Sequence, residues 1–173
     1  AITQANELMQ ANDPQQELLQ NMITKQASRI DKIIGDTLNM ARSKETYPTL
    51  IDVAACLERF IVEDCLDVND QIDYRVSDTA QIQFDEQQLR QVLIKLIRIA
   101  IRHNAAEAEH IQIRVYSYKN LVHIEVCDFG EGVATQDQST LFQPFFSTSI
   151  NGTGLGLYLS HSFCEANQAK LYY

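Results

Sequence analysis

The chain has 173 residues, a formal net charge of −9 and an apolar fraction of 45%. This length suffices for one good-sized domain or for a smaller one with an appendage, and the apolar fraction argues against a wholly disordered chain. The negative charge argues against nonspecific binding to nucleic acid or to an anionic membrane surface, so we expect no nucleic-acid partner.

The four cysteines predict reduced thiols rather than zinc or disulfides. Cys56, Cys65, Cys127 and Cys164 are scattered, form no CxxC pair and have no histidine at a ligand spacing. No apolar run approaches the roughly 20 residues that span a bilayer, and no signal peptide is visible. We therefore expect a cytoplasmic protein. Both ends lie within helix or strand patterns, so we also expect a longer parent, whose membrane anchor, if it has one, lies in other segments.

Two helical patterns open the chain. Residues 1–11 fit the end of a helix, which Asn12-Asp13-Pro14 then breaks. Asp13 is suited to cap the next helix, with Pro14 at its first position. In that second helix the apolar residues recur near heptad spacing: Leu19, Ile23, Ile30, Ile33, Ile34, Leu38 and Ala41.

These two helices predict an antiparallel hairpin over residues 1–45, incomplete at its N-terminus. A hairpin alone buries too little apolar surface, so its stripe needs a partner. Two copies associating into a four-helix bundle would supply one, and packing against the rest of the same chain is the alternative. We expect a homodimer through the hairpin.

Residues 46–173 predict an α+β domain, and residues 43–48 predict the linker that leads into it. The patterns indicate a strand at 49–51, a helix at 53–65, strands at 72–77 and 80–84, and a helix at 86–104. Strands from Ile111 and Leu121 follow, joined by a tight Lys119-Asn120 turn, and then a helix at 155–165 and the start of a last, incomplete strand. The expected architecture is an α/β sandwich with helices on one face of a mixed sheet.

The segment DFGEG, residues 128–132, follows the strand LVHIEVC. A carboxylate such as that of Asp128, at the end of a strand, can accept a hydrogen bond from an exocyclic amine, and glycines let the backbone approach a flat ring. An ordinary capped turn has the same local pattern.

The segment NGTGLGL, residues 151–157, places glycines at the start of a helix. Exposed backbone N–H groups and the helix dipole favour an anion there, so the segment suits a phosphate. It lacks the GK[ST] of a P-loop, and no strand precedes it as in a Rossmann motif. Between the two glycine-rich segments lies LFQPFFST, residues 141–148, which fits either a lid anchored by phenylalanines or the core packing of a long loop.

In this order, the three segments strongly resemble the G1, F and G2 boxes of the histidine-kinase branch of the GHKL (Bergerat-fold) ATPases. The resemblance covers nearly the whole chain and is nearest in flavour to the nitrogen-regulation and type IV pilus sensor kinases. It implies the core of a two-component sensor histidine kinase, with residues 46–173 as its ATP-binding catalytic domain. Such a protein transfers the γ-phosphoryl of ATP to a histidine, here expected upstream of Ala1, and then to an aspartate of a response-regulator receiver domain. The implied ATP-binding residues are Arg102, His103, Asp128, Gly130, Gly132, Phe142, Phe145, Gly152, Thr153, Gly154, Leu155 and Gly156.

The helix at 86–104 departs from this family. Its relatives carry two asparagines four residues apart, the second of which helps to hold the Mg²⁺ that bridges the ATP phosphates, and this chain has Lys95 and Ile99 there. Ile99 offers no oxygen to a hard cation and the Lys95 ammonium would repel one, so we expect no metal ligand here, although Lys95 could meet a phosphate directly. Ser149 is a further departure, at a position where many relatives have lysine. We predict a buried stripe of Leu89, Val92, Leu93, Leu96 and Ala100, with Lys95, Ile99 and Arg102 on its flank.

Two functions therefore compete. The first is an active Mg-ATP-dependent histidine kinase core, and the second is a degenerate pseudokinase, a dimeric signalling module with weak or no Mg-ATP binding. A gyrase-like or chaperone-like ATPase is disfavoured, because those families have a glutamate where Lys95 stands and lack the helical hairpin.

Overall fold

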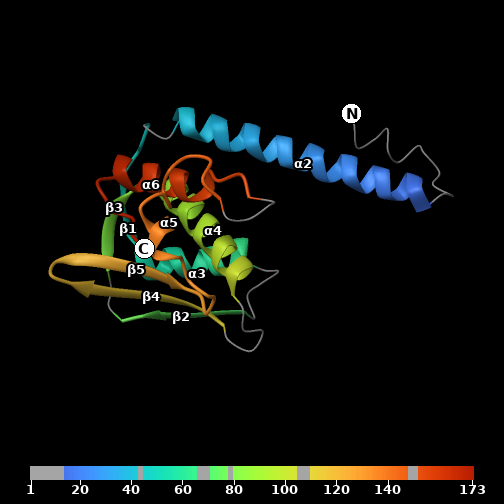
Figure 1. The fold of residues 1–173 in the computed structure, drawn as a ribbon. Coiled ribbons are helices and arrows are strands. Elements are labelled where there is room, and N and C mark those ends of the chain that lie inside the picture. Colours follow the sequence, from blue (N-terminus) through green and yellow to red (C-terminus); the bar gives the residue numbers. More distant parts are fainter. Residues whose placement is uncertain (1–13, 43–44, 66–70, 78–79, 105–109, 148–151) are drawn as a thin grey trace.

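The computed structural model describes residues 14–42, 45–65, 71–77, 80–104, 110–147 and 152–173. The predicted first helix at 1–11, the cap at Asp13 and the departure at Ser149 lie outside these residues. The second predicted helix is present as α2 (Pro14–Arg42), 29 residues long, which extends well beyond the body of the molecule (Figure 1). None of the described helices is long and apolar enough to cross a membrane.

The apolar stripe of α2 is exposed in this single chain. Its eight large apolar side chains are between 37% and 62% exposed: Leu18, Leu19, Met22, Ile23, Ile30, Ile33, Ile34 and Leu38. The described remainder of the chain therefore does not bury the stripe, which argues against the alternative of packing within one chain.

The body has two small sheets covered by helices on one face (Figure 1). In the larger sheet, β2 (Ile72–Val76) pairs parallel with β4 (Ile111–Tyr118), which pairs antiparallel with β5 (Leu121–Cys127). In the smaller, β1 (Thr49–Asp52) pairs antiparallel with β3 (Gln81–Phe84). The helices are α3 (Val53–Asp64), α4 (Glu86–His103) and α6 (Gly156–Ala166), with a short α5 (Thr135–Gln138) that the sequence did not predict. The predicted α+β sandwich with a mixed sheet is confirmed.

Local chemistry explains these elements. Along β4, Ile111, Ile113 and Val115 are at most 1% exposed, as the period-two pattern requires of a strand with one buried face. Lys119 and Asn120 both have positive φ, 50° and 62°, which is the backbone of a type I′ hairpin turn and confirms the predicted turn.

Helix α4 begins at a capping aspartate and buries one stripe. The Asp85 carboxylate accepts a hydrogen bond from the Gln88 backbone N–H at 3.1 Å. The buried apolar residues are Leu89, Val92, Leu93, Ile97 and Ala100. The prediction was wrong at one position, because Ile97 is buried while Leu96 is only partly so. Since 3.6 residues make a turn, Ile97 lies at the edge of the stripe, whereas Leu96 lies near its middle and is partly buried against the core.

A buried polar network ties α4 to α6 and to the chain after α2. The Asn167 side chain accepts from the Asp85 backbone N–H at 2.8 Å and donates to Gln88 Oε1 at 2.7 Å. Asp85 accepts in turn from the Tyr47 backbone N–H, and the Gln88 amide donates to the Glu45 carbonyl. The segment after α2 is thus hydrogen-bonded to the start of α4.

The chain from 169 to 173, predicted as the start of a strand, pairs with no strand of the described chain. Its tyrosines make side-chain contacts instead: Tyr172 Oη lies 3.2 Å from His123 Nδ1, and Tyr173 Oη accepts from the Val133 backbone N–H at 2.9 Å. A strand exists only through its ladder to a neighbour, so an alternating pattern alone did not decide this segment.

Candidate functional site

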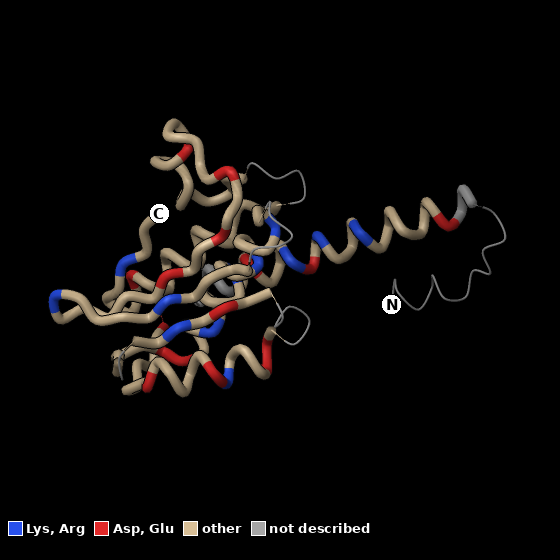
Figure 2. Tube along the Cα trace, turned by 90° about the horizontal axis from the view of Figure 1, so that it is seen from below, with Lys and Arg blue, Asp and Glu red and all other residues tan. Residues whose placement is uncertain are grey.

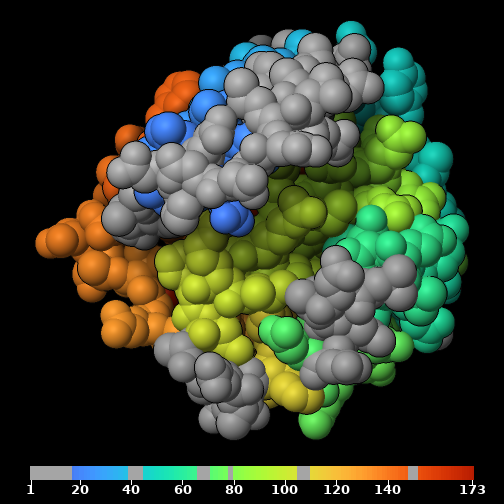
Figure 3. Space-filling view, turned by 90° about the vertical axis from the view of Figure 1, so that its right-hand side faces the viewer, coloured from blue at the N-terminus to red at the C-terminus, as the bar shows by residue number. Residues whose placement is uncertain are grey.

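Helix α4 forms one wall of the candidate site. Lys95, Ile99 and His103 are spaced four residues apart, so they share one face of the helix and span about 12 Å along it. Figure 3 shows α4, in yellow-green, exposed between the blue helix α2 and the teal helix α3. The two glycine-rich segments meet this helix at different heights.

The first segment, after β5, meets the C-terminal end of α4. Asn104 Oδ1 accepts from the Phe129 backbone N–H at 3.2 Å, and Asp128 Oδ1 accepts from the Gly130 N–H at 2.9 Å. A Cβ on Gly130 would collide with the His103 carbonyl, so only glycine allows this close approach. Gly132 has a φ of +75°, a conformation that also favours glycine. The exposed Asp128 carboxylate therefore lies in a loop that packs against the backbone of His103.

The second segment meets the middle of α4. Gly154 has a φ of +68°, and a Cβ there would collide with the Phe145 backbone. Leu155, the N-cap of α6, is 1% exposed and offers no side-chain cap to the first turn of the helix. A Cβ on Gly156 would lie 3.8 Å from Ile99 Cδ1. The N-terminus of α6, with Gly152 and Thr153 before it, is thereby held against the Ile99 turn of α4 and suits an anion.

The phenylalanine-rich segment packs beside this loop, but only one of its two candidate anchoring phenylalanines contacts α6. The Phe142 ring lies 5.3 Å from the His161 ring of α6, and the Phe145 N–H donates to the Gly154 carbonyl at 3.0 Å. Phe145 itself is 70% exposed and has a φ of 68°. Phe142 is therefore an anchor, whereas the Phe145 side chain plugs no cavity of the described chain.

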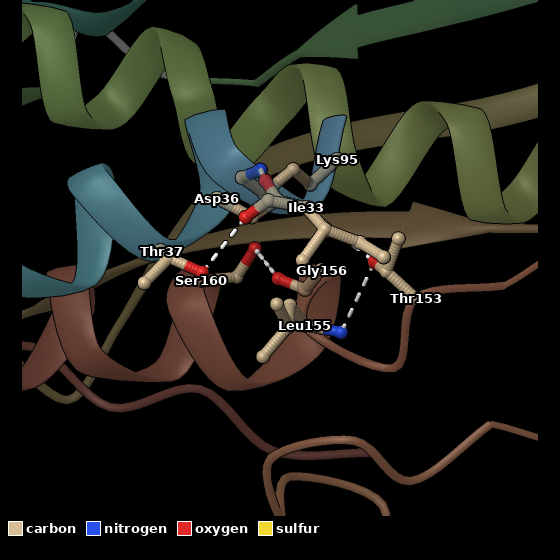
Figure 4. Close-up of polar contacts among 8 residues, drawn as sticks. All are labelled: Ile33, Asp36, Thr37, Lys95, Thr153, Leu155, Gly156 and Ser160. Carbon is tan, nitrogen blue, oxygen red and sulfur yellow. Dashed lines mark hydrogen bonds and ion pairs between the residues drawn. The ribbon is translucent and has the colours of Figure 1, made fainter. Parts of the chain in front are cut away.

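Lys95 is held by helix α2. Its Nζ lies 2.9 Å from Asp36 Oδ1, and Thr153 Oγ1 donates to Asp36 Oδ2 at 3.3 Å. Figure 4 shows these side chains converging from α4, α2 and the glycine loop. The positions at which the resemblance leads one to expect asparagines thus present an ammonium and the apolar Ile99, which offer no oxygen to Mg²⁺. Within the described residues, no group of three or more His, Cys, Asp or Glu side chains could hold a metal.

Cations gather around this contact. Partial desolvation, followed by repulsion from Arg102, Lys95 and Arg98, lowers the pKa of Lys32, while Asp36 acts in the opposite direction. We call Lys32, Lys95, Arg98 and Arg102 the cation cluster. Figure 2 shows basic and acidic segments together where α2 meets the body. An overall acidic protein therefore has a local group of cations between α2 and α4.

Two residues of the site escaped sequence reasoning. Asn104 follows the predicted basic pair directly, and an amide at the end of a helix was the only signal for it. Asp36 has no local signal, because its partners lie 59 and 117 residues away in the chain.

Comparisons with known proteins agree with this architecture. The family described as histidine kinase-, DNA gyrase B- and HSP90-like ATPase matches residues 84–173. The sensor protein kinase PilS of Pseudomonas aeruginosa is 33% identical over all of this chain and 34% of its own length. The sensor histidine kinase ZraS of Escherichia coli K12 is 29% identical over 85% of this chain and 32% of its own. The chain thus spans about a third of these relatives.

Solved structures show the same fold. Full-length ShkA in complex with AMPPNP has a TM-score of 0.71 at 23% identity, over 89% of this chain and 34% of that one. The catalytic domain of the histidine kinase ThkA has a TM-score of 0.61 at 24% identity, over 70% of this chain and 82% of that one.

Layers of this kind, with two glycine-rich loops along one helix, define an ATP-binding domain of the Bergerat type. The chain belongs to the histidine kinase-, DNA gyrase B- and HSP90-like ATPase family, and the curated relatives named above are sensor kinases. The predicted family is confirmed.

Proposed function

We propose that this chain binds ATP as the core of a sensor histidine kinase, with the nucleotide lying along α4. The supporting observation is that α4 brings the Asp128 segment and the 152–156 loop to one helix face. Asp128 would accept from the adenine amine, and the N-terminus of α6 would hold the phosphates. His103 lies at the Asp128 end of this helix face, and Arg102 belongs to the cation cluster.

The proposed reaction passes the γ-phosphoryl to a histidine outside this chain and then to a receiver-domain aspartate of a response regulator. The chain contributes positioning and charge neutralisation, which is most of what phosphoryl transfer asks of a protein. The cation cluster supplies the charge. We further propose that the kinase works in the cytoplasm as a homodimer joined through the exposed stripe of α2.

A specific observation favours a second candidate, the pseudokinase. Lys95 and Ile99 leave the Mg²⁺ position without oxygen ligands, and Lys95 is already paired with Asp36. A protein of this kind would bind nucleotide without metal, or weakly, and would signal through the arrangement of α2 against the domain.

Titration with AMPPNP, with and without Mg²⁺, tests both candidates. An affinity that Mg²⁺ raises tenfold or more supports the kinase, since that gain corresponds to about 1.4 kcal/mol of metal-dependent binding. Equal binding in both conditions supports the pseudokinase. No binding at millimolar analogue would contradict a nucleotide site altogether.

A pair of variants checks the adenine end. Asp128→Asn should weaken AMPPNP and adenosine alike by about tenfold or more, because it removes an acceptor for the base amine. Glu131→Gln, a matched change on an exposed neighbour in the same loop, should leave both affinities unchanged.

A further inference from the structure

Asp36 is an unusual residue in α2. It is 5% exposed, although its helix is otherwise largely exposed, and its side chain is 7% exposed. A carboxylate rarely becomes this buried unless it is paired. Both of its oxygens are engaged, one by Lys95 Nζ and the other by Thr153 Oγ1.

The groups around Asp36 are those that would bind a phosphate. An ammonium, a hydroxyl from the glycine loop and the nearby N-terminus of α6 all favour an oxyanion. Thr153 Oγ1 also lies 3.4 Å from the Leu155 backbone N, so Asp36 contacts the loop at the start of α6 (Figure 4). Two members of the cation cluster are close to Asp36, because Lys95 contacts it directly and Asp36 acts on the charge of Lys32. The carboxylate therefore occupies a site suited to a doubly or triply charged anion.

We propose that Asp36 is a built-in competitor for the phosphates of the nucleotide, so that α2 holds the site closed until ligand displaces the carboxylate or α2 moves. This inference rests on the proposed function, because the displacing ligand is a nucleoside polyphosphate. By linkage the effect is reciprocal: any signal that shifts α2 away from Lys95 and Thr153 raises nucleotide affinity, and bound nucleotide releases α2 by the same factor.

The contacts that the chain makes before and after residues 43–44 support such coupling. Asp36 contacts the middle of α4, while Glu45 and Tyr47 hydrogen-bond to its first turn through Gln88 and Asp85. The end of α2 that leads to residues 45–47 is therefore held near α4, and a displacement of α2 would chiefly break the contacts of Asp36.

The first test measures AMPPNP affinity of the full 173-residue chain. Asp36→Asn keeps the shape and removes the competing charge, so it should bind AMPPNP about tenfold more tightly than the unaltered chain, in the 5- to 150-fold range of allosteric couplings. Asp31→Asn is the matched control, an exposed aspartate of the same helix, and should change nothing. Adenosine, which has no phosphates, should bind both variants equally.

The second test uses the unaltered chain and needs no variant to fold. Carbodiimide-driven coupling of glycine ethyl ester, read by mass spectrometry, should label Asp31 readily and Asp36 slowly. Adding AMPPNP should accelerate labelling of Asp36 and leave Asp31 unchanged.

The outcomes separate this inference from the proposed function. Equal AMPPNP affinity of the Asp36→Asn and unaltered chains, or unchanged Asp36 labelling despite binding, would overturn the inference and leave the nucleotide site standing. Failure of every variant to bind AMPPNP and adenosine would overturn the proposed function, and the inference with it.

Discussion

Gly130 and Gly154 show at the residue scale why the motifs need their residue types. At both positions a Cβ would collide with backbone, of His103 in one case and of Phe145 in the other. Because the colliding atoms belong to the backbone, no rotamer change of a neighbouring side chain could make room for a Cβ at either glycine. A larger residue at either position would therefore push its loop away from α4 or from the phenylalanine-rich segment.

A prediction about pH belongs to Cys164. Burial raises the pKa of this thiol from 9.0 to about 11, so folding favours its protonated form. The stabilisation is complete below pH 9 and is lost as pH rises toward 11. We expect the unaltered chain to lose on the order of 2 kcal/mol more unfolding free energy across that window than Cys164→Ala does.

Urea unfolding at about pH 8 to 11 measures the difference. The Ser162→Ala chain, altered at a nearby position that does not titrate, should follow the unaltered protein. Cys56 and Cys65, whose pKa values burial also raises, are present in all three chains and cancel in the comparison. Parallel pH profiles for the unaltered and Cys164→Ala chains would contradict the assignment.

What the sequence could and could not predict divides by distance along the chain. The glycine loops, the Lys119-Asn120 turn and the Lys95 and Ile99 positions were visible because turn chemistry and helical spacing act within a few residues. The Asp36 contact was not, because pairing across 59 and 117 residues depends on where two elements pack. No local pattern shows this tertiary contact, which brings α2 into the candidate site.

At the element scale, the exposed apolar stripe of α2 raises the question of what covers it. Its heptad-like pattern correctly predicted a long helix, and the structure leaves the stripe exposed. Exposed apolar side chains along several turns of one helix indicate an interface rather than a free surface. The terminal segment at 169–173 shows the reverse case, an alternating pattern that found no partner strand among the described residues.

We predict that the stripe joins two copies of the chain. Ile23→Glu combined with Ile30→Glu, at positions 51% and 56% exposed, should weaken the dimer at least 100-fold. Burial of an isoleucine is worth about 1.5–3 kcal/mol, and the doubly substituted dimer loses four buried isoleucines, two from each chain. Analytical ultracentrifugation over a concentration series gives the dissociation constant.

The control for this prediction lies on α3. Val62 is 65% exposed and apolar but belongs to the body, so Val62→Glu should leave the dimer intact. A chain that sediments as a monomer at every concentration without substitution would show that the stripe has another partner.

At the scale of the whole molecule, α4 contacts each of the other parts of the candidate site. Its first turn holds the segment after α2, its middle holds Lys95 against Asp36, and its end holds the Asp128 loop. A ligand along α4 would therefore touch the same helix that fixes α2. We propose that Lys95 and Ile99 on this helix determine whether the molecule binds nucleotide with metal or without it.

Restoring asparagine at both positions tests that statement. Lys95→Asn with Ile99→Asn supplies two amide oxygens where a hard cation finds none, so AMPPNP affinity should become Mg²⁺-dependent by about tenfold or more. An asparagine side chain is no longer than the isoleucine that now faces Gly156, so the loop need not move to admit it. Gln91→Asn, a change to the same residue type one turn earlier on α4, should create no Mg²⁺ dependence. Calorimetric titration with and without Mg²⁺ distinguishes the two chains, and an unchanged response in the doubly substituted chain would mean that positions 95 and 99 do not face the phosphates.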